Sequence, residues 1–111
     1  IPETGREAAL QALAAGCDAL YSAGDFSALG AIQALQEKGV RIPEDFGIVG
    51  TANESFTALM SPSLSSLALK ASDIGRAAAR AFLDGAPDGE TVIPMELIIR
   101  QSSNKNNLWQ K

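Results

Sequence analysis

Residues 18–50 read DALYSAGDFSALGAIQALQEKGVRIPEDFGIVG and contain the pattern of a strand, a turn, a helix and a second strand. The short apolar run over 18–23 is typical of a buried strand. A glycine breaks this run, and Asp25 after it predicts the N-cap of a helix that continues to Lys38. Residues 46–50 form the second apolar strand. Two apolar strands joined by a helix predict a parallel pair with a right-handed crossover.

The alternation of helices and strands continues on both sides of this stretch. Upstream, Thr4 and Glu7 have the spacing of a capping box, and Gly16 predicts the end of the helix that they start. Downstream, residues 51–64 have no sustained period and predict an exposed connection. The remaining predicted elements are a strand over 65–69, a helix over 73–83 with Ile74, Ala77, Ala78, Ala81 and Phe82 on its inner face, strands over 91–93 and 96–100, and a polar tail from Gln101. This order predicts an α/β fold with a mainly parallel sheet and flanking helices.

The composition excludes several classes of function. The 111 residues carry nine Lys and Arg against 13 Asp and Glu, a net charge of −4, and the basic residues are too scattered to grip nucleic acid. The sequence has no histidine, which removes Ser-His and Cys-His nucleophiles and His-containing zinc sites. Neither a dinucleotide-binding nor a P-loop glycine pattern occurs. We therefore predict no catalytic residue, metal or cofactor, and interpret Cys17 as a small, partly buried hydrophobe.

Three polar residues follow the predicted strand ends, where ligands bind in open α/β sheets. Asp25 either only caps its helix or also faces a polar ligand. Asn53 and Glu54 either belong to a solvated loop or exchange hydrogen bonds with the hydroxyl groups of a sugar or another polyol. We take Asp25, Asn53 and Glu54 as the candidate ligand-binding residues.

Four apolar residues are candidates for an interaction surface. Phe56, Leu59 and Met60 lie in the connection that ought to be exposed, and Leu29 of the preceding helix can contribute to the same surface. Such a cluster marks either a loop covered by the protein itself or an interface with another protein. The residues alone leave both interpretations open.

The chain resembles the C-terminal part of LacI/GalR-family transcriptional repressors. The resemblance rests on residues 18–50, SPSLSSL over 61–67, IGRAAARAFLDG over 74–85, and the closing segment Pro94–Ser102, which follow one another at close to the family's spacing. It implies a periplasmic-binding-protein-like (type I) core with two α/β subdomains around an effector cleft. It also implies a cytoplasmic, non-enzymatic homodimer, with Leu29 and the segment 59–60 near the dimer interface. The implied effector is a small sugar-like or nucleoside-like molecule, and DNA would be bound by a helix-turn-helix region absent from this chain.

The resemblance also divides the chain between the two subdomains. Residues 1–67 would form most of the C-terminal subdomain, and residues 68–98 would cross over and supply a helix and a strand to the N-terminal subdomain. Residues 99–111 would then return as a strand and a polar tail. The start at Ile-Pro, without an initiator Met, predicts that the chain is part of a longer one.

Two departures from the family pattern fall on the expected ligand contacts. Gly24 stands where the family has an Asn that contacts the effector, and Ala52 stands where it has an Asp. Asp25 is retained, with an architectural role in the family, so Asn53 and Glu54 are expected to take over ligand contacts. A periplasmic solute-binding protein of a transport system is the alternative function, and a signal peptide upstream instead of a helix-turn-helix would identify it.

Overall fold

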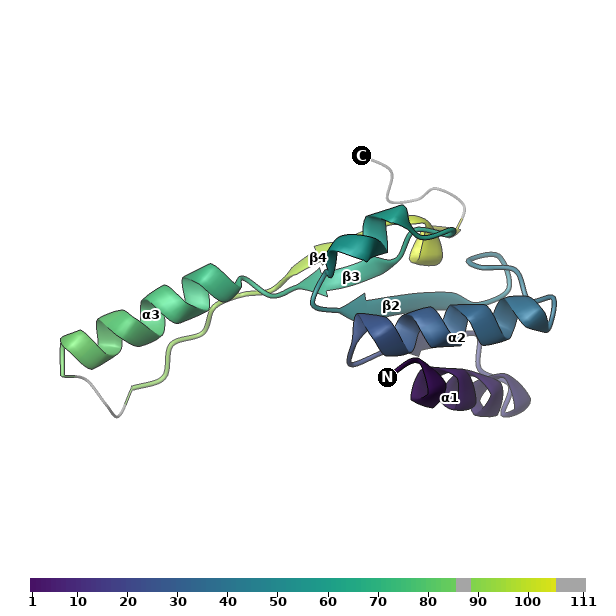
Figure 1. Cartoon of the computed structure of the whole chain (residues 1–111), viewed down its shortest axis with the longest axis horizontal. Helices are drawn as coiled ribbons and strands as arrows, with labels where there is room; N and C mark the ends of the chain where they lie inside the picture. The colour runs from purple at the N-terminus through teal and green to yellow at the C-terminus, as the bar shows by residue number, and fades with distance from the viewer. Residues whose placement is uncertain (86–88, 106–111) are drawn as a thin grey trace.

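A four-stranded sheet forms the centre of the structure, a computed structural model that describes residues 1–85 and 89–105 (Figure 1). Its strands, in spatial order, are β1 (Ala19–Tyr21), β2 (Gly47–Thr51), β3 (Ser65–Ala68) and β4 (Glu96–Ile98). The pairs β1–β2 and β2–β3 are parallel, whereas β4 runs antiparallel to β3. The expected α/β fold with a mainly parallel sheet is confirmed.

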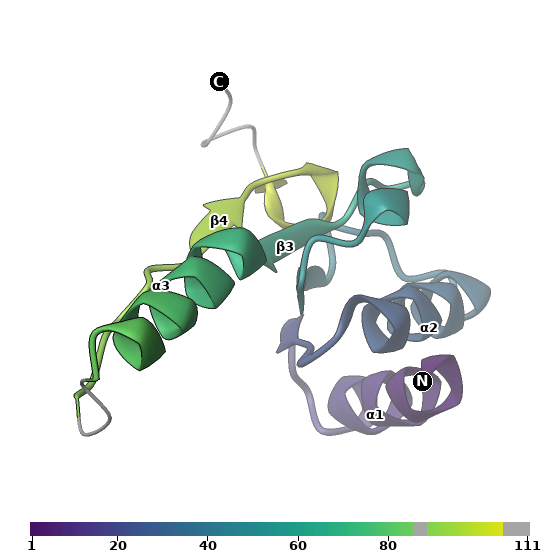
Figure 2. The same cartoon turned by 60° about the vertical axis from the view of Figure 1, so that its left-hand side comes forward.

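Two helices, α1 (Pro2–Ala14) and α2 (Asp25–Glu37), pack side by side, and α2 packs on β2 (Figure 2). Glycines allow their backbones to touch. A Cβ atom at Gly5 would lie 1.7 Å from the carbonyl oxygen of Ser27, and one at Gly30 would lie 1.9 Å from that of Pro2. Neither position can therefore carry a side chain while the helices keep this distance.

The core lies between α2 and the sheet. Its fully buried members come from α1, α2, β2 and the segments before β2 and β3, and they are Ala9, Ala28, Ala31, Ile32, Leu35, Phe46, Ile48 and Leu64. Leu20 of β1 packs against this cluster, while its strand neighbour Tyr21 is exposed on the other face of the sheet. The core fixes the positions of the strand ends on which the candidate site depends.

The third long helix, α3 (Ala71–Leu83), projects away from the sheet and from α1 and α2 (Figure 1). It contains no buried residue. Phe82 and Leu83 are 84% and 78% exposed. The helix was correctly predicted from the sequence, but no residue of its expected inner face is buried.

Several helix and strand boundaries differ from those predicted from local sequence signals. The helix α1 begins at Pro2 with Ile1 as N-cap, so Thr4 and Glu7 lie inside the helix, exposed, and make no capping box. Proline explains the earlier start, because its fixed φ and missing N–H suit the first helical turn. The predicted strand over residues 91–93 does not form. The prediction that Cys17 is partly buried is also wrong, because Cys17 is exposed.

Two segments predicted to be irregular contain short 3-10 helices. They are η1 (Ser55–Leu59), within the connection after β2, and η2 (Gln101–Ser103), at the start of the predicted polar tail. Each buries one polar residue completely, Thr57 in η1 and Ser102 in η2. Hydrogen bonds to distant segments hold both residues, which a reading of local sequence cannot detect.

Candidate functional site

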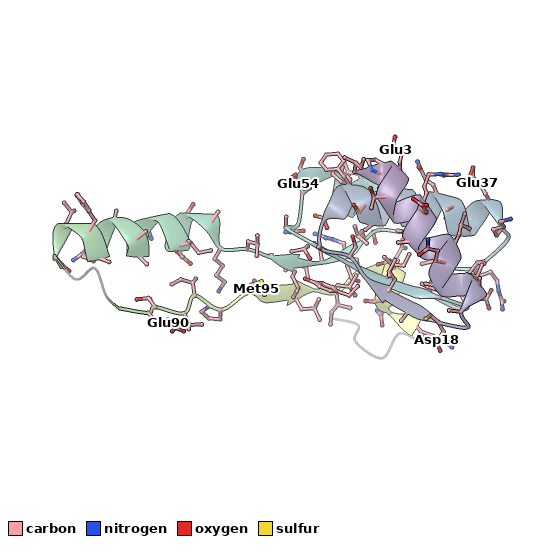
Figure 3. The ribbon with its side chains drawn as sticks, turned by 90° about the horizontal axis from the view of Figure 1, so that it is seen from below. Glu3, Asp18, Glu37, Glu54, Glu90 and Met95 are labelled. Atoms are coloured by element: carbon pink, nitrogen blue, oxygen red, sulfur yellow. The ribbon has the colours of Figure 1, made fainter. Side chains whose placement is uncertain are left out.

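The candidate site lies at the carboxyl ends of β1 and β2, where the loop 52–54 faces the start of α2. The two strands are parallel neighbours, so their carboxyl ends meet at one edge of the sheet. Figure 3 shows Glu54 at the end of the body nearer to α3, and Asp18, which precedes β1, at the opposite end. The structure thus brings Asp25, Asn53 and Glu54 together at one edge, as the sequence predicts.

Asp25 is buried and bound from two directions. Its side chain is 2% exposed. The backbone N–H of Glu54 donates to Oδ2 at 2.7 Å, and the hydroxyl of Ser66 in β3 donates to Oδ1 at 2.8 Å. The N-cap of α2 is Gly24, not Asp25, and no side chain caps the helix. The prediction that Asp25 is the N-cap is therefore wrong, because its carboxylate bonds to another segment of the chain.

Ser66 extends this network to the next amide of the loop. Its Oγ accepts a hydrogen bond from the backbone N–H of Asn53 at 2.9 Å, while its hydroxyl donates to Asp25 Oδ1. Gly50 of β2 leaves space for the carboxylate, since a Cβ atom there would lie 2.2 Å from Asp25 Oδ1. The sequence analysis missed Ser66 and Gly50. A glycine inside an apolar strand was the available signal for Gly50, because it often marks a close approach of another group.

The loop adopts a left-handed bend without glycine. Ala52 has φ 103° and Asn53 has φ 53°. Asn tolerates this region better than most residues, but alanine is strained in it because its Cβ crowds the neighbouring carbonyl. The backbone N–H of Ala52 donates to the carbonyl of Leu67 at 2.8 Å, next to the two amides that Ser66 and Asp25 accept. Consecutive backbone amides are thus held by groups outside the loop.

The side chains of Asn53 and Glu54 are available at the edge. Thr57 Oγ1 lies 2.7 Å from the carbonyl oxygen of Glu54 and 3.3 Å from Asn53 Oδ1. A hydroxyl has one proton, and the shorter contact takes it, so the Asn53 amide is weakly engaged. The Glu54 side chain is exposed. The edge therefore offers an amide that donates and accepts hydrogen bonds, beside a carboxylate that accepts them.

The four apolar candidates separate into different environments. Leu59 is 86% exposed. Phe56 is half-buried and packs on Phe26 of α2, with 4.8 Å between the ring centroids and 45° between the ring planes. Leu29 is also half-buried, whereas Met60 packs against the core. Met60 and Phe56 are thus at least partly covered by the protein itself, whereas Leu59 is exposed.

The opposite edge of the sheet carries an ion pair. The guanidinium of Arg41 donates to both carboxylate oxygens of Asp45, at 3.0 and 2.8 Å, and the Arg41 backbone N–H also donates to Oδ2. These bonds lower the pKa of Asp45 to about 2 and raise the pKa of Arg41. A cavity of about 160 Å³ lies there, lined by Asp18, Pro43, Glu44, Asp45, Gly47, Ser103 and Lys105.

Two further properties concern the described residues as a group. Over residues 1–85 and 89–105, no three His, Cys, Asp or Glu side chains are arranged to hold a metal ion. None of the helices in the same part of the chain has the length and apolarity needed to cross a membrane.

Known proteins are similar to this chain in fold and in sequence. The family model described as "Periplasmic binding protein-like domain" matches residues 2–103. The chain is 33% identical over 106 residues to the HTH-type transcriptional regulator MalR of Streptomyces coelicolor, and the match covers 91% of this chain and 31% of the relative. The chain thus spans about a third of the length of that curated relative.

Solved structures agree with the sequence match. The transcription regulator CcpA of Lactococcus lactis superposes with a TM-score of 0.79 at 31% identity, over 92% of this chain and 40% of that one. A LacI family transcriptional regulator from Arthrobacter sp. FB24, in complex with lactose, gives a TM-score of 0.78 at 33% identity, over 92% and 41% of the two chains. The chain belongs to the family of periplasmic binding protein-like domains and corresponds to the C-terminal portion of LacI-family regulators.

Proposed function

We propose that this chain is the effector-binding and dimerisation region of a ligand-responsive transcriptional repressor. The observation that carries the proposal is that Asn53 and Glu54 lie side by side at the edge formed by the carboxyl ends of the strands. The relatives of this chain are transcriptional regulators. An amide beside a carboxylate matches the alternating donors and acceptors of a polyol. The Arthrobacter regulator that superposes on this chain is in complex with lactose, which favours a sugar over a nucleoside.

Residues 1–67 would form most of one subdomain, and residues 68–98 would contribute α3 and the segment before β4 to the other, whereas β4 itself pairs with β3 in the first subdomain's sheet. The exposed apolar side chains of α3 support this division, because an amphipathic helix needs a partner for its apolar face. Residues 99–111 would return to the first subdomain. Of these, the described Arg100 donates to the carbonyl of Leu64 at 2.8 Å, and Ser102 is buried against β2 and β3.

Regulation would follow from closure of the two subdomains on the ligand. A ligand that contacts both subdomains favours the orientation in which both contacts form. Linkage then couples ligand occupancy to DNA affinity, through a helix-turn-helix region outside this chain and through the dimer. The protein would act in the cytoplasm, without enzymatic activity.

Titration calorimetry of the intact protein with a panel of sugars and nucleosides tests the ligand assignment. Asn53→Ala and Glu54→Gln should each weaken binding by on the order of tenfold, because the first removes a hydrogen-bonding amide and the second replaces a charged acceptor by a neutral amide. Glu44→Gln, which changes a carboxylate at the opposite edge of the sheet, is the matched control and should leave affinity unchanged. Absence of binding across the whole panel would reject effector control of this kind.

The dimerisation surface would centre on Leu59, with Leu29 and Phe56 beside it and Met60 supporting it from the core side. Leu59→Asp should convert dimers to monomers in sedimentation, because it places a charge in an apolar interface. Ala15→Asp, which places the same charge on an exposed residue just after α1, is the control and should leave the dimer intact. A Leu59→Asp protein that remains dimeric would contradict this surface.

A periplasmic solute-binding protein is the second candidate, favoured by the description of the matching family model. Both functions use the same fold and the same edge of the sheet, so the site does not separate them. The residues that precede this segment in the intact protein do separate them. A helix-turn-helix identifies the repressor, and a signal peptide identifies the transport component.

A further inference from the structure

We propose that Asp25 is a positioning residue, which holds the loop 52–54 in the conformation that presents Asn53 and Glu54 to a ligand. This inference rests on the proposed function, which assigns ligand binding to Asn53 and Glu54. The hydrogen bonds that support it lie within the chain. Asp25 would act through the loop backbone and would not touch the ligand itself.

The first argument is the geometry of the contact. One carboxylate and one hydroxyl, from α2 and β3, receive two consecutive amides of the loop. Glu54 N–H donates to Asp25 Oδ2 at 2.7 Å, and Asn53 N–H donates to Ser66 Oγ at 2.9 Å, with Ser66 donating in turn to Asp25 Oδ1 at 2.8 Å. Both carboxylate oxygens are thus used, and the network fixes the backbone of Asn53, whose side chain is weakly engaged, and of Glu54, whose side chain is exposed.

The second argument is the strain in the bend. Ala52, at φ 103°, adopts a conformation that persists only where surrounding contacts hold it. Without those contacts the loop would relax toward ordinary dihedral angles, and the side chains of Asn53 and Glu54 would leave their present directions. The hydrogen bonds to Asp25 and Ser66 act on the two residues directly after the strained position.

The third argument is that the fold makes room for this carboxylate. Gly50 leaves the space that Asp25 occupies, and a Cβ atom there would also lie 3.1 Å from Leu64 Cδ2. Among the described residues no ion pair involves Asp25, so amide and hydroxyl donors stabilise its charge, together with the N-terminus of α2. Burial of a carboxylate without a cation is costly unless each oxygen is hydrogen-bonded, and here each oxygen is.

Amide hydrogen exchange of the intact protein, without ligand, tests the proposal. Asp25→Ala should accelerate exchange at Glu54, and Ser66→Ala should accelerate it at Asn53, each on the order of 10- to 100-fold, because a charge-assisted or buried hydrogen bond is lost. The amides of β2 should remain protected. Asp25→Asn should stay close to the parent protein, because an amide can accept from Glu54 N–H through its oxygen and donate to Ser66 Oγ through its nitrogen.

Asp18→Ala is the matched control, since it removes an exposed carboxylate from the opposite edge of the sheet, and it should leave exchange at Asn53 and Glu54 unchanged. Unchanged exchange at Glu54 in a folded Asp25→Ala protein would overturn the proposal, and so would equal acceleration throughout β2. If Asp25→Ala does not fold, Ser66→Ala decides, and unchanged exchange at Asn53 in that variant overturns the proposal.

Ligand titration of the same variants separates positioning from direct contact. A positioning role predicts that Asp25→Ala weakens sugar binding at least about tenfold while Asp25→Asn stays within about threefold of the parent protein. Comparable weakening in both variants would mean that the charge itself meets the ligand, against the proposal. If no sugar or nucleoside binds the parent protein, the proposed function fails, whereas the exchange experiment still decides whether Asp25 holds the loop.

Discussion

Replacing Ser102 by alanine should destabilise the protein strongly, although it removes a single oxygen atom near the end of the described chain. Ser102 is fully buried. Its hydroxyl donates to the carbonyl of Ile48 in β2 at 2.6 Å and accepts the backbone N–H of Ser65 in β3 at 2.9 Å. The side chain thus bridges backbone groups of two neighbouring strands.

The size of the effect follows from the two partners. Alanine leaves one buried N–H and one buried C=O without the bond that the hydroxyl provided, and each such loss costs about 1–3 kcal/mol. The void left by one oxygen is smaller than the volume of about 30 Å³ that a water molecule occupies in the liquid, so water does not replace the hydroxyl. Allowing for partial relaxation of the strands, the free energy of unfolding should fall by about 2–4 kcal/mol.

Urea unfolding followed by circular dichroism measures this change, and the melting temperature should fall by roughly 10–20 °C. Ser72→Ala is the matched control, because Ser72 is exposed in the first turn of α3, and it should change stability by less than about 0.5 kcal/mol. A loss below about 1 kcal/mol for Ser102→Ala, with an unchanged dependence on urea, would refute the argument that this hydroxyl is the essential bridge.

Three further predictions concern the glycines, the bend and the ion pair. Gly30→Ala should cost about 2–3 kcal/mol in urea unfolding, because its Cβ would lie 1.9 Å from a carbonyl oxygen of α1. Gly75→Ala in α3, with nothing within 4 Å, should instead raise helix stability by about 0.5–1 kcal/mol, and similar results for the two would contradict the packing argument. Ala52→Gly should raise the free energy of unfolding by about 0.5–1 kcal/mol, since glycine adopts φ 103° without strain, and a loss of stability would count against strain at this position. Asp45 has a folded-state pKa of about 2, below the ordinary value of about 3.9, so its contribution is present above pH 4 and disappears as the pH falls toward 2. Asp45→Asn should therefore reduce the dependence of the free energy of unfolding on pH in this acid range. An unaltered dependence would show that the ion pair does not contribute to stability.

The strand–turn–helix–strand unit over residues 18–50 could be predicted because its signals are local. Apolar runs, a breaking glycine and a helix-forming segment each act within a few residues. The position of the site followed from the same pattern, because parallel strands place their carboxyl ends at one edge. The sequence therefore indicated where Asp25, Asn53 and Glu54 would meet.

The role of Asp25 could not be predicted, because its partner Ser66 lies 41 residues away. Prediction from local sequence treats an Asp before a helical segment as a capping residue. Here the hydrogen bond from Ser66 of β3 engages the carboxylate instead. Ser102 is a similar case. Its position in a polar run predicts exposure, whereas the backbone groups of β2 and β3 supply its partners.

The close backbone approaches at Gly5, against Ser27, and at Gly30, against Pro2, limit how α1 and α2 can move relative to each other. Side chains can change rotamer to accommodate sliding of one helix past another, but α1 and α2 meet through backbone atoms, which have no such freedom. The two helices should therefore move together as one rigid body. Asp25 is the first residue of α2, so a ligand that displaces the loop beside it would tilt α1 as well, and the far end of α1 would report on occupancy of a site that it does not touch.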